Sequence, residues 1–372
     1  MVNSNPSIFI VAGEASGDMH GANLIKALKA AIPGVKVAGI GGPKMREAGL
    51  ECLYAAEKLA VVGLTEVITH LKDIWLARQR ARRFLSTQRP DLFIPIDYPD
   101  FNFGLAAFAK KLGIPVLYYI SPQVWAWRRN RVKKIAKIVD KMAVILPFEE
   151  EFYRRYGINA TFVGHPLLDI MPPPTPINLV NPTIGLLPGS RRSEIKHILP
   201  LMLETASILH KKRPVLKFVL PVAPTLDLGW LKQFVHCYSY RLPLSLEKAS
   251  YELIQRCSFL LVASGTATLE TAILERPFVV IYRLSTLSYL LGRMLVKVPY
   301  IGLVNWVAGE KIIPEFIQEK AKPALIAQYV LETLANQEKI KQIKDRLKRI
   351  RQCLGSPGVA QRVAQLAREL VK

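Results

Sequence analysis

A turn in the second half of the chain has the composition of a phosphate-binding loop. The apolar segment 183–187 runs into Gly189, Ser190 and Arg191, and a helical pattern opens directly behind them. Free backbone N–H groups and the positive end of a helix dipole converge at such a turn, and an arginine adds a two-pronged donor to the same anion. The alternative is an ordinary helix start with a good cap, which is the commoner case for a single Gly-Ser pair.

A second turn repeats this pattern. Ser264, Gly265 and Thr266 follow the apolar run 259–263 and open the helical segment 267–275. The repetition, and the buried strand expected before each turn, favour a ligand over two unrelated caps. Two phosphate-binding turns in one half predict a nucleotide diphosphate site.

Acidic residues follow two apolar runs of the first half. Asp97 and Asp100 come after the run 92–96, and Glu14 comes after the run 7–12. A carboxylate at the end of a strand can accept the proton of an attacking hydroxyl, so Asp97 is a candidate general base, and Glu14 can orient the acceptor. The alternatives are turn formation by the two aspartates and stabilisation of a helix start by Glu14.

Two polar residues in the second half are candidates for holding the rest of a sugar nucleotide. Glu270 lies one turn into the helical segment behind Thr266, where a carboxylate can hold ribose hydroxyls, the alternative being an exposed helix charge. Asn305 offers a donor and an acceptor to a sugar. The histidines, aspartates and glutamates show no metal-ligand spacing, so we expect neither a metal nor a cofactor. Arg191 and the helix starts would then balance the charge of a departing diphosphate.

Strand-like apolar runs alternate with helical patterns along the chain. The strand candidates are 7–12, 35–40, 92–96, 116–120, 141–145 and 160–163 in the first half, and 183–187, 217–220, 259–263 and 278–281 in the second. Continuously apolar strands are typical of parallel sheets covered on both faces. The pattern predicts an α/β protein with two doubly wound, Rossmann-like domains facing each other across a cleft.

Proline marks the expected boundary between these domains. The segment 171–180 is proline-rich and is expected to form a stiff linker. It separates an N-terminal, acceptor-binding domain of residues 1–170 from a C-terminal, nucleotide-binding domain of residues 181–345. The charged helical segment 346–372 is expected to cross back onto the N-terminal domain.

Charge and cysteine usage limit the possible partners and location. The 372 residues include 51 Lys and Arg against 29 Asp and Glu, a net charge of +22 that attracts nucleic acid, anionic membranes or phosphorylated small molecules alike. No nucleic-acid-binding motif accompanies this charge, so we expect no nucleic acid partner. The four cysteines lie far apart and no signal peptide precedes the first strand, which predicts a reduced, cytoplasmic protein.

A helical stretch in the first half combines an apolar stripe with basic residues. Arg78, Arg80, Arg82 and Arg83 follow the stripe. Core packing is the usual fate of such a stripe, but a basic helix with tryptophan near its end also lies on anionic membranes and admits lipid chains. The net charge favours membrane and acyl-chain contact for this stripe, which consists of Leu64, Val67, Ile68, Leu71, Ile74 and Trp75.

Together these motifs resemble the lipid A disaccharide synthase family of glycosyltransferases. Two of them are specific, Val11-Ala-Gly-Glu-Ala-Ser-Gly-Asp18 and Ser121-Pro-Gln-Val-Trp-Ala-Trp127. The others are Gly41-Gly-Pro-Lys-Met45, Asp97-Tyr-Pro-Asp-Phe-Asn102, Leu146-Pro-Phe148, Gly164-His-Pro166, Leu187-Pro-Gly-Ser-Arg191 and Ala263-Ser-Gly-Thr-Ala267. They run in order from about residue 7 to residue 316, and the last fifty residues match only in helical character.

The resemblance implies a GT-B fold and an inverting transfer. UDP-2,3-diacylglucosamine would donate its sugar to the 6-hydroxyl of 2,3-diacylglucosamine 1-phosphate, giving a β(1→6) disaccharide 1-phosphate and UDP. In that family Asp97 would be the general base, Glu14 a cleft carboxylate, Arg191 and Glu270 nucleotide ligands, and Asn305 a cleft residue. The enzyme would be cytoplasmic and peripheral on the anionic inner membrane.

The chain departs from the family pattern at two positions. Tyr98 stands where a smaller residue is general, so the cleft beside Asp97 is expected to be narrower. Val304 stands where proline is usual, which bears on the role of the adjacent Asn305. Two rival functions remain open. One is another GT-B enzyme that uses UDP-N-acetylglucosamine, either a glycosyltransferase with a lipid-linked acceptor or a 2-epimerase. The other is a basic nucleic-acid-binding protein without catalysis.

Overall fold

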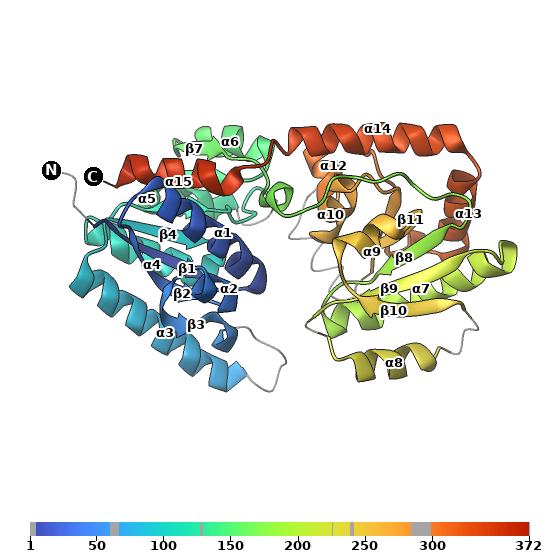
Figure 1. Ribbon diagram of the computed structural model, residues 1–372, viewed down its shortest axis with the longest axis horizontal. Helices are drawn as coiled ribbons and strands as arrows, with labels where there is room; N and C mark the ends of the chain where they lie inside the picture. The colour runs from blue at the N-terminus through green and yellow to red at the C-terminus, as the bar shows by residue number, and fades with distance from the viewer. Residues whose placement is uncertain are drawn as a thin grey trace. The chain divides into compact units, whose positions relative to one another are not determined.

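The computed structural model describes residues 5–59, 67–126, 129–224, 226–238, 242–283 and 299–371. Two compact units make up the chain (Figure 1). Unit 1 comprises Met1–Asp169 and Leu354–Lys372, and unit 2 comprises Ile170–Cys353. Each unit is built on one parallel sheet.

Unit 1 contains a seven-stranded parallel sheet in the order β3-β2-β1-β4-β5-β6-β7. The central strand β1 pairs with β2 on one side and β4 on the other, with Ile8 opposite Val37 and Leu92. The strands are β1 (Ser7–Ala12), β2 (Lys36–Gly41), β3 (Glu51–Ala55), β4 (Leu92–Ile96), β5 (Leu117–Tyr119), β6 (Lys141–Val144) and β7 (Ala160–Phe162).

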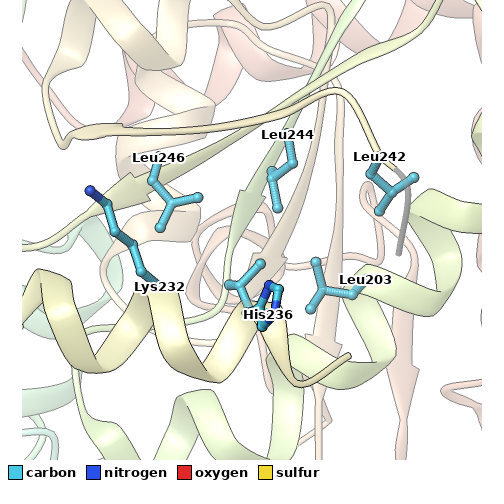
Figure 2. Close-up of a pocket in the computed structure, with 7 residues that line it drawn as sticks. Leu203, Lys232, His236, Leu242, Leu244 and Leu246 are labelled. Carbon is cyan, nitrogen blue, oxygen red and sulfur yellow. The ribbon is translucent and has the colours of Figure 1, made fainter. Parts of the chain in front are cut away.

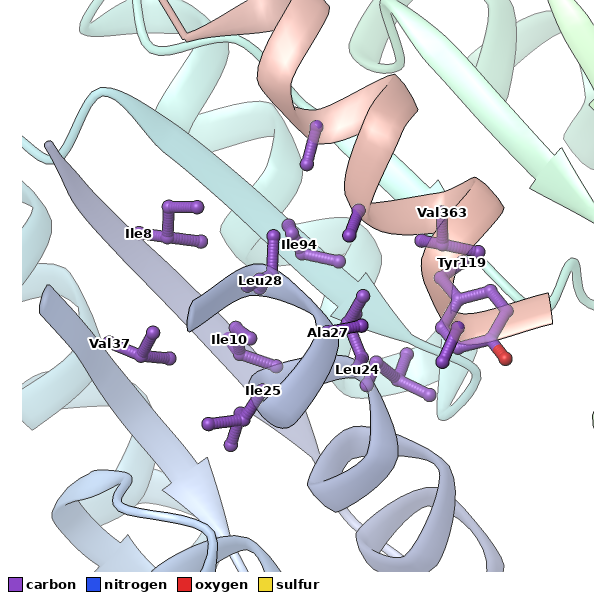
Figure 3. Packing of buried hydrophobic residues seen from close by; sticks show 14 of the residues in the cluster. Ile8, Ile10, Leu24, Ile25, Ala27, Leu28, Val37, Ile94, Tyr119 and Val363 are labelled. Carbon is purple, nitrogen blue, oxygen red and sulfur yellow. The ribbon is translucent and has the colours of Figure 1, made fainter. Parts of the chain in front are cut away.

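Side chains alternate between the two faces of a sheet along each strand, and these strands are mostly apolar, so both faces of the sheet are apolar and helices cover both. Ile8 and Ile10 of β1 belong to one buried cluster with Leu24 and Leu28 of α1 (Figure 3), whereas Phe9 belongs to a second cluster. That second cluster takes in α3, α4 and α5. The helices are α1 (Ala15–Ala31), α2 (Pro43–Glu47), α3 (Val67–Gln88), α4 (Pro99–Lys111), α5 (Val132–Ile138) and α6 (Pro147–Arg154).

The last helix, α15 (Val359–Leu370), belongs to unit 1 and packs along α1 (Figure 1). The Asp169 carboxylate accepts hydrogen bonds from the backbone N–H groups of Gly358, Val359 and Ala360 at 2.6–3.2 Å, which caps the helix start. The segment that returns to unit 1 begins at Leu354. The expected boundary at residue 346 is therefore wrong, because it falls inside α14 (Gln337–Cys353), a helix of unit 2.

Unit 2 contains a six-stranded parallel sheet in the order β10-β9-β8-β11-β12-β13. One face of it packs on α7 and α13 through a continuous apolar cluster. The strands are β8 (Thr183–Leu187), β9 (Lys217–Val222), β10 (Leu244–Lys248), β11 (Phe259–Ala263), β12 (Phe278–Tyr282) and β13 (Glu315–Ile317). The helices are α7 (Arg192–Lys212), α8 (Leu228–His236), α9 (Tyr251–Arg256), α10 (Ala267–Ile273), α12 (Leu303–Ala308), α13 (Pro323–Leu334) and α14.

The proline-rich segment is hydrogen-bonded to two side chains of unit 2. The buried Arg276 guanidinium donates to the carbonyl and hydroxyl oxygens of Thr175 and to the carbonyl oxygen of Pro176. The Gln255 amide donates to the carbonyl of Pro173 at 2.6 Å. These bonds tie the segment to unit 2, to which it belongs.

Candidate active site

The strand orders show where each unit is built to bind a ligand. In unit 1 the chain winds outward from β1 through β2 to β3, and from β4 through β5 to β7 in the opposite direction. In unit 2 the same reversal falls between β8 and β11. Open α/β sheets bind ligands at the carboxyl ends of the strands where the order reverses. Glu14 and Asp97 follow β1 and β4, and the two glycine-containing turns follow β8 and β11.

The backbone holds Asp97 in an unusual conformation. Asp97 and Tyr98 both have positive φ angles, 44° and 47°, which is sparsely populated for residues other than glycine and costs of the order of 1–3 kcal/mol each. The Asp97 N–H donates to the Tyr119 carbonyl at 3.0 Å. The Asp97 carbonyl accepts from the Asn102 amide and the Tyr118 hydroxyl, both at 2.7 Å. These contacts hold the backbone from which the carboxyl group projects.

The electrostatic environment gives Asp97 the character of a base. Burial, and to a smaller extent the negative charge of Glu14, raise its pKa from 3.8 to about 6, while a hydrogen bond from the Tyr98 N–H opposes this shift. A pKa just below neutrality suits a general base that must be ionised yet proton-seeking at pH 7. Glu14 itself is exposed at the start of α1 and makes no side-chain cap there. The structure thus brings the two predicted carboxylates together.

Asp18, which the sequence reasoning did not single out, joins two of the motifs. Its buried carboxylate accepts from the backbone N–H groups of Gly42, Lys44 and Met45 at 2.8–3.0 Å, at the start of α2. A Cβ on Gly42 would lie 2.6 Å from that carboxylate, so only glycine fits. The bonds anchor the first turn of α1, and with it the loop that carries Glu14.

Tyr98 fills the space between the loops after β1 and β4. Its ring stacks on Phe101 with centroids 5.5 Å apart. A Cβ added to Gly13 would meet the ring at 2.4 Å, so the absence of a side chain at Gly13 accommodates the bulky tyrosine.

In unit 2 the turn after β8 is shaped by its glycine. Gly189 has φ 106°, and a Cβ there would lie 2.4 Å from a carboxylate oxygen of Glu194. Ser190 and Arg191 are exposed. The Arg191 side chain is 75% exposed and one guanidinium nitrogen lies 3.2 Å from Glu194, so most of its donors face solvent.

The turn after β11 is tied to a neighbouring loop. The Ser264 hydroxyl donates to the Ile301 carbonyl at 2.9 Å, and Gly265 and Thr266 are exposed at the start of α10. Burial raises the pKa of Glu270, one turn into α10. Because β8 and β11 are hydrogen-bonded neighbours, the two turns lie side by side.

Asn305 does not offer its amide to a ligand, and the sequence-based expectation for it is corrected. The residue is fully buried, and its side-chain oxygen accepts from the N–H groups of Ile312 and Ile313 at 3.0 Å each. Its amide nitrogen donates to the Ile313 carbonyl and to the Glu315 carboxylate at 2.9 Å each. Asn305 therefore braces its own loop, and the neighbouring Val304 is buried as well.

The apolar stripe is only partly visible. Leu64 lies outside the described residues, as do the side chains of Val67 and Ile68 in α3. Leu71 and Trp75 are 59% and 58% exposed, so core packing is not their role in this chain. Ile74, another member of the stripe, is half-buried and packs against the core beside Ala77, Ala81 and Leu85, which form the buried face of α3. No helix in the described part of the chain is long and apolar enough to cross a bilayer.

A cavity of about 230 Å³ lies elsewhere, between α7, α8 and β10 (Figure 2). Its lining is mainly leucine, with Lys232 and His236 of α8 beside it. His236 ends α8 and Leu244 begins β10, which places the cavity toward the amino ends of the strands. It is therefore separate from the carboxyl-end site. Within the described ranges, no three His, Cys, Asp or Glu residues form a group that could hold a metal.

Solved structures with the same fold define the general class. The chain aligns with a kitacinnamycin glycosyltransferase at a TM-score of 0.66, with 15% identity over 99% of this chain and 100% of that one. A calicheamicin glycosyltransferase aligns at 0.63, with 15% identity and 98% of both chains covered. At such low identity the likeness concerns the fold alone. It confirms the predicted α/β architecture of two doubly wound, Rossmann-like domains of the GT-B type.

Sequence comparison then identifies the family. The model of the lipid-A-disaccharide synthetase family matches residues 8–370. The lipid-A-disaccharide synthase of Nitrosococcus oceani is 47% identical, over 98% of this chain and 96% of that protein. The synthase of Syntrophus aciditrophicus is 46% identical, over 98% of both. The chain belongs to the lipid-A-disaccharide synthetase family, as its motifs predicted, and is a glycosyltransferase.

Proposed function

We propose that the chain catalyses the inverting transfer of 2,3-diacylglucosamine from its UDP derivative to the 6-hydroxyl of 2,3-diacylglucosamine 1-phosphate. The products are a β(1→6) disaccharide 1-phosphate and UDP. The observation that carries this proposal is the Asp97 carboxylate at the order reversal of the unit 1 sheet, with its pKa raised to about 6. The family match over nearly the whole chain supports the choice of substrates.

Asp97 acts as the general base in this reaction. Its carboxylate accepts the proton of the acceptor 6-hydroxyl while that oxygen attacks the anomeric carbon of the donor sugar. The bond from the anomeric carbon to the diphosphate oxygen breaks, and its electron pair leaves with UDP. Attack opposite to the leaving group inverts the anomeric centre. Asp97 then returns its proton to solvent, and Glu14 orients the acceptor.

Unit 2 holds the nucleotide. The N–H groups of the turn Gly189–Arg191 and those of Gly265 and Thr266 bind the two phosphates, with the Arg191 guanidinium as a further donor. The Ser264 N–H is already donated to the Ile281 carbonyl. Glu270 holds the ribose hydroxyls. Negative charge grows on the diphosphate as it departs, and Arg191 and the two helix starts stabilise it without a metal ion.

Contact with the membrane completes the proposal. Leu71 and Trp75 lie one helical turn apart on α3 and are exposed, and the exposed Arg82 follows on the same face. An apolar patch beside basic residues lies at the boundary between headgroups and acyl chains of an anionic bilayer. We assign the enzyme to the cytoplasmic surface of the inner membrane, where acylated substrates are dissolved.

Release of UDP tests the function. The wild-type protein is expected to release UDP from the acylated donor only when the acceptor 1-phosphate is present. Turnover of UDP-N-acetylglucosamine without acylated donor would favour the rival GT-B enzyme, whose fold is shared by the UDP-N-acetylglucosamine 2-epimerase of Neisseria meningitidis at a TM-score of 0.64 and 14% identity. Salt-sensitive retention of RNA or DNA with no UDP release from any donor would favour the nucleic-acid-binding alternative.

A further inference from the structure

One buried carboxylate in unit 1 receives more hydrogen bonds than a helix cap requires. Glu149 is 1% exposed. One of its oxygens accepts from the Ser121 hydroxyl at 2.6 Å and from the Trp125 indole N–H at 2.9 Å. The other accepts from the backbone N–H groups of Leu146 and Ile145 at 3.0 and 3.3 Å.

The two oxygens serve different purposes. The bonds to Leu146 and Ile145 cap the start of α6, which is what an acidic residue in the first helical turn commonly does. The bonds to Ser121 and Trp125 reach 28 and 24 residues back along the chain to another loop. A buried charge is costly unless every lone pair is satisfied, so a helix cap alone gives no reason to bury this carboxylate completely. The second oxygen is committed to holding the loop of residues 121–126.

This loop stands beside the proposed base. It follows β5, the strand that neighbours β4 in the sheet. The carbonyl of Tyr119, two residues before the loop, accepts the N–H of Asp97, and the hydroxyl of Tyr118 donates to the Asp97 carbonyl. The loop also contains most of the specific motif 121–127, to which the proposed chemistry assigns no role.

Two more contacts hold the loop to α6. The Tyr153 hydroxyl donates to the Pro122 carbonyl at 3.0 Å. The Trp125 ring meets the Phe148 ring edge-on, with centroids 4.8 Å apart. Within the described residues 121–126, only Gln123 is exposed, so the loop is buried on the α6 side and presents Gln123 outward.

We propose that Glu149 is a positioning residue for the transfer reaction, which holds the loop 121–126 as a fixed wall of the acceptor-sugar site next to Asp97. The inference rests on the proposed function and deepens it. Loss of the Glu149 charge lets the loop move, so the acceptor binds less tightly. UDP binding, which belongs to unit 2, is unaffected.

Protonation of Glu149 is expected to have the same effect as its replacement. Burial raises the pKa of Glu149 to about 7, against the four hydrogen bonds that lower it. Of the groups around it, Tyr153 on its own helix is titratable only well above neutrality, and Ser121 and Trp125 are uncharged donors. A proton on the carboxyl oxygen that faces Ser121 and Trp125 turns this acceptor into a donor, which then points at the Ser121 O–H and the Trp125 N–H. The loop is therefore expected to be released as the pH falls through neutrality.

The test compares Glu149→Gln with Glu151→Gln, a matched control on the same helix whose carboxylate is exposed and paired with Arg155. We expect Glu149→Gln to raise the KM for the acceptor 1-phosphate about 10-fold, as the loss of bonds to a charged group allows, and to flatten the pH dependence of that KM near pH 7. UDP affinity by calorimetry stays at the wild-type value. The fluorescence emission of Trp125 is obtained for the wild-type protein and for the variant by subtracting the emission of the same protein with Trp125→Phe. We expect this emission to differ between Glu149→Gln and the wild-type protein.

A folded Glu149→Gln protein with wild-type acceptor KM and unchanged Trp125 emission would overturn the positioning role. Should that variant fail to fold, Tyr153→Phe removes only the bond to Pro122, and it is expected to raise the acceptor KM in the same direction; an unchanged value would again refute the inference. Absence of UDP release by the wild-type protein contradicts the proposed function itself. Wild-type turnover with an unaltered acceptor KM in both variants contradicts only the role of Glu149.

Discussion

Replacement of Asp97 by asparagine separates its chemistry from its backbone conformation. Asparagine, like aspartate, tolerates a positive φ angle, so Asp97→Asn keeps the backbone at φ 44° and removes only the charge and the basicity. Loss of a general base typically lowers kcat by about 100-fold to 10,000-fold. We expect a fall of at least about 100-fold in UDP release from acylated donor and acceptor 1-phosphate.

The same variant is expected to be more stable than the wild-type protein. The folded state raises the pKa of Asp97 from 3.8 to about 6, so it binds this proton more tightly than the unfolded chain does. Its contribution to stability is complete below pH 4 and is lost as the pH rises through 6. At pH 7 the ionised carboxylate therefore destabilises unit 1 by up to about 3 kcal/mol, which a neutral isostere removes.

Urea unfolding at pH 4 and pH 7 measures this effect, with Asp100→Asn as the matched control in the same loop. The Asp100 side chain is 76% exposed and paired with Arg131, so its replacement is expected to change both turnover and stability little. The wild-type kcat/KM should fall tenfold per pH unit below about pH 6, where Asp97 becomes protonated. An Asp97→Asn protein that keeps a tenth of wild-type turnover would refute the role of Asp97 as the base. A variant whose stability relative to the wild-type protein is the same at pH 7 as at pH 4 would refute the electrostatic argument.

Three further variants test the other parts of the site. Arg191→Ala is expected to weaken UDP binding about 10-fold in calorimetry, and unchanged affinity would place the diphosphate elsewhere. The double variant Leu71→Ser and Trp75→Ser should lower co-sedimentation with anionic phospholipid vesicles about 10-fold. The control Val180→Ser, at a position 82% exposed in unit 2, should leave co-sedimentation unchanged. Equal co-sedimentation of the double variant and the wild-type protein would show that α3 does not contact the membrane. Asp18→Ala removes the acceptor of three N–H groups, two of them buried, so unit 1 should lose about 2–3 kcal/mol in urea unfolding. Wild-type stability of this variant would contradict the capping role of Asp18.

The sequence predicts the buried strands well and the edge strands poorly. Every strand with neighbours on both sides was predicted within a few residues, because it is continuously apolar. The three strands that were missed, β3, β10 and β13, all lie at sheet edges. Their sequences mix charged with apolar residues, and most of their side chains are half-buried or exposed. A strand that is paired on one side only is less buried and can contain charged residues. It therefore lacks the continuous apolar run by which a strand is recognised in the sequence.

The site residues divide in the same way. Asp97 and the two glycine-containing turns could be placed from local sequence, because each follows directly on an apolar strand. Asp18 and Glu149 could not, since the loops that they hold lie 24 or more residues away along the chain and only the folded sheet brings them together. Asn305 shows the opposite error. Its residue type suits a sugar, but only the structure reveals that Ile312, Ile313 and Glu315 use all its donors and acceptors.

Several groups at the carboxyl edge of the unit 1 sheet lower the stability of the folded state. Asp97 combines a strained backbone with an ionised, partly buried carboxylate, and Glu149 of α6 buries a second carboxylate against the neighbouring loop 121–126. Both groups have a raised pKa, so both destabilise the folded state more as the pH rises toward 7. The two apolar clusters that cover the faces of the sheet offset this cost. The two apolar clusters therefore stabilise unit 1 enough to keep a basic carboxylate and a fixed loop at this edge of the sheet.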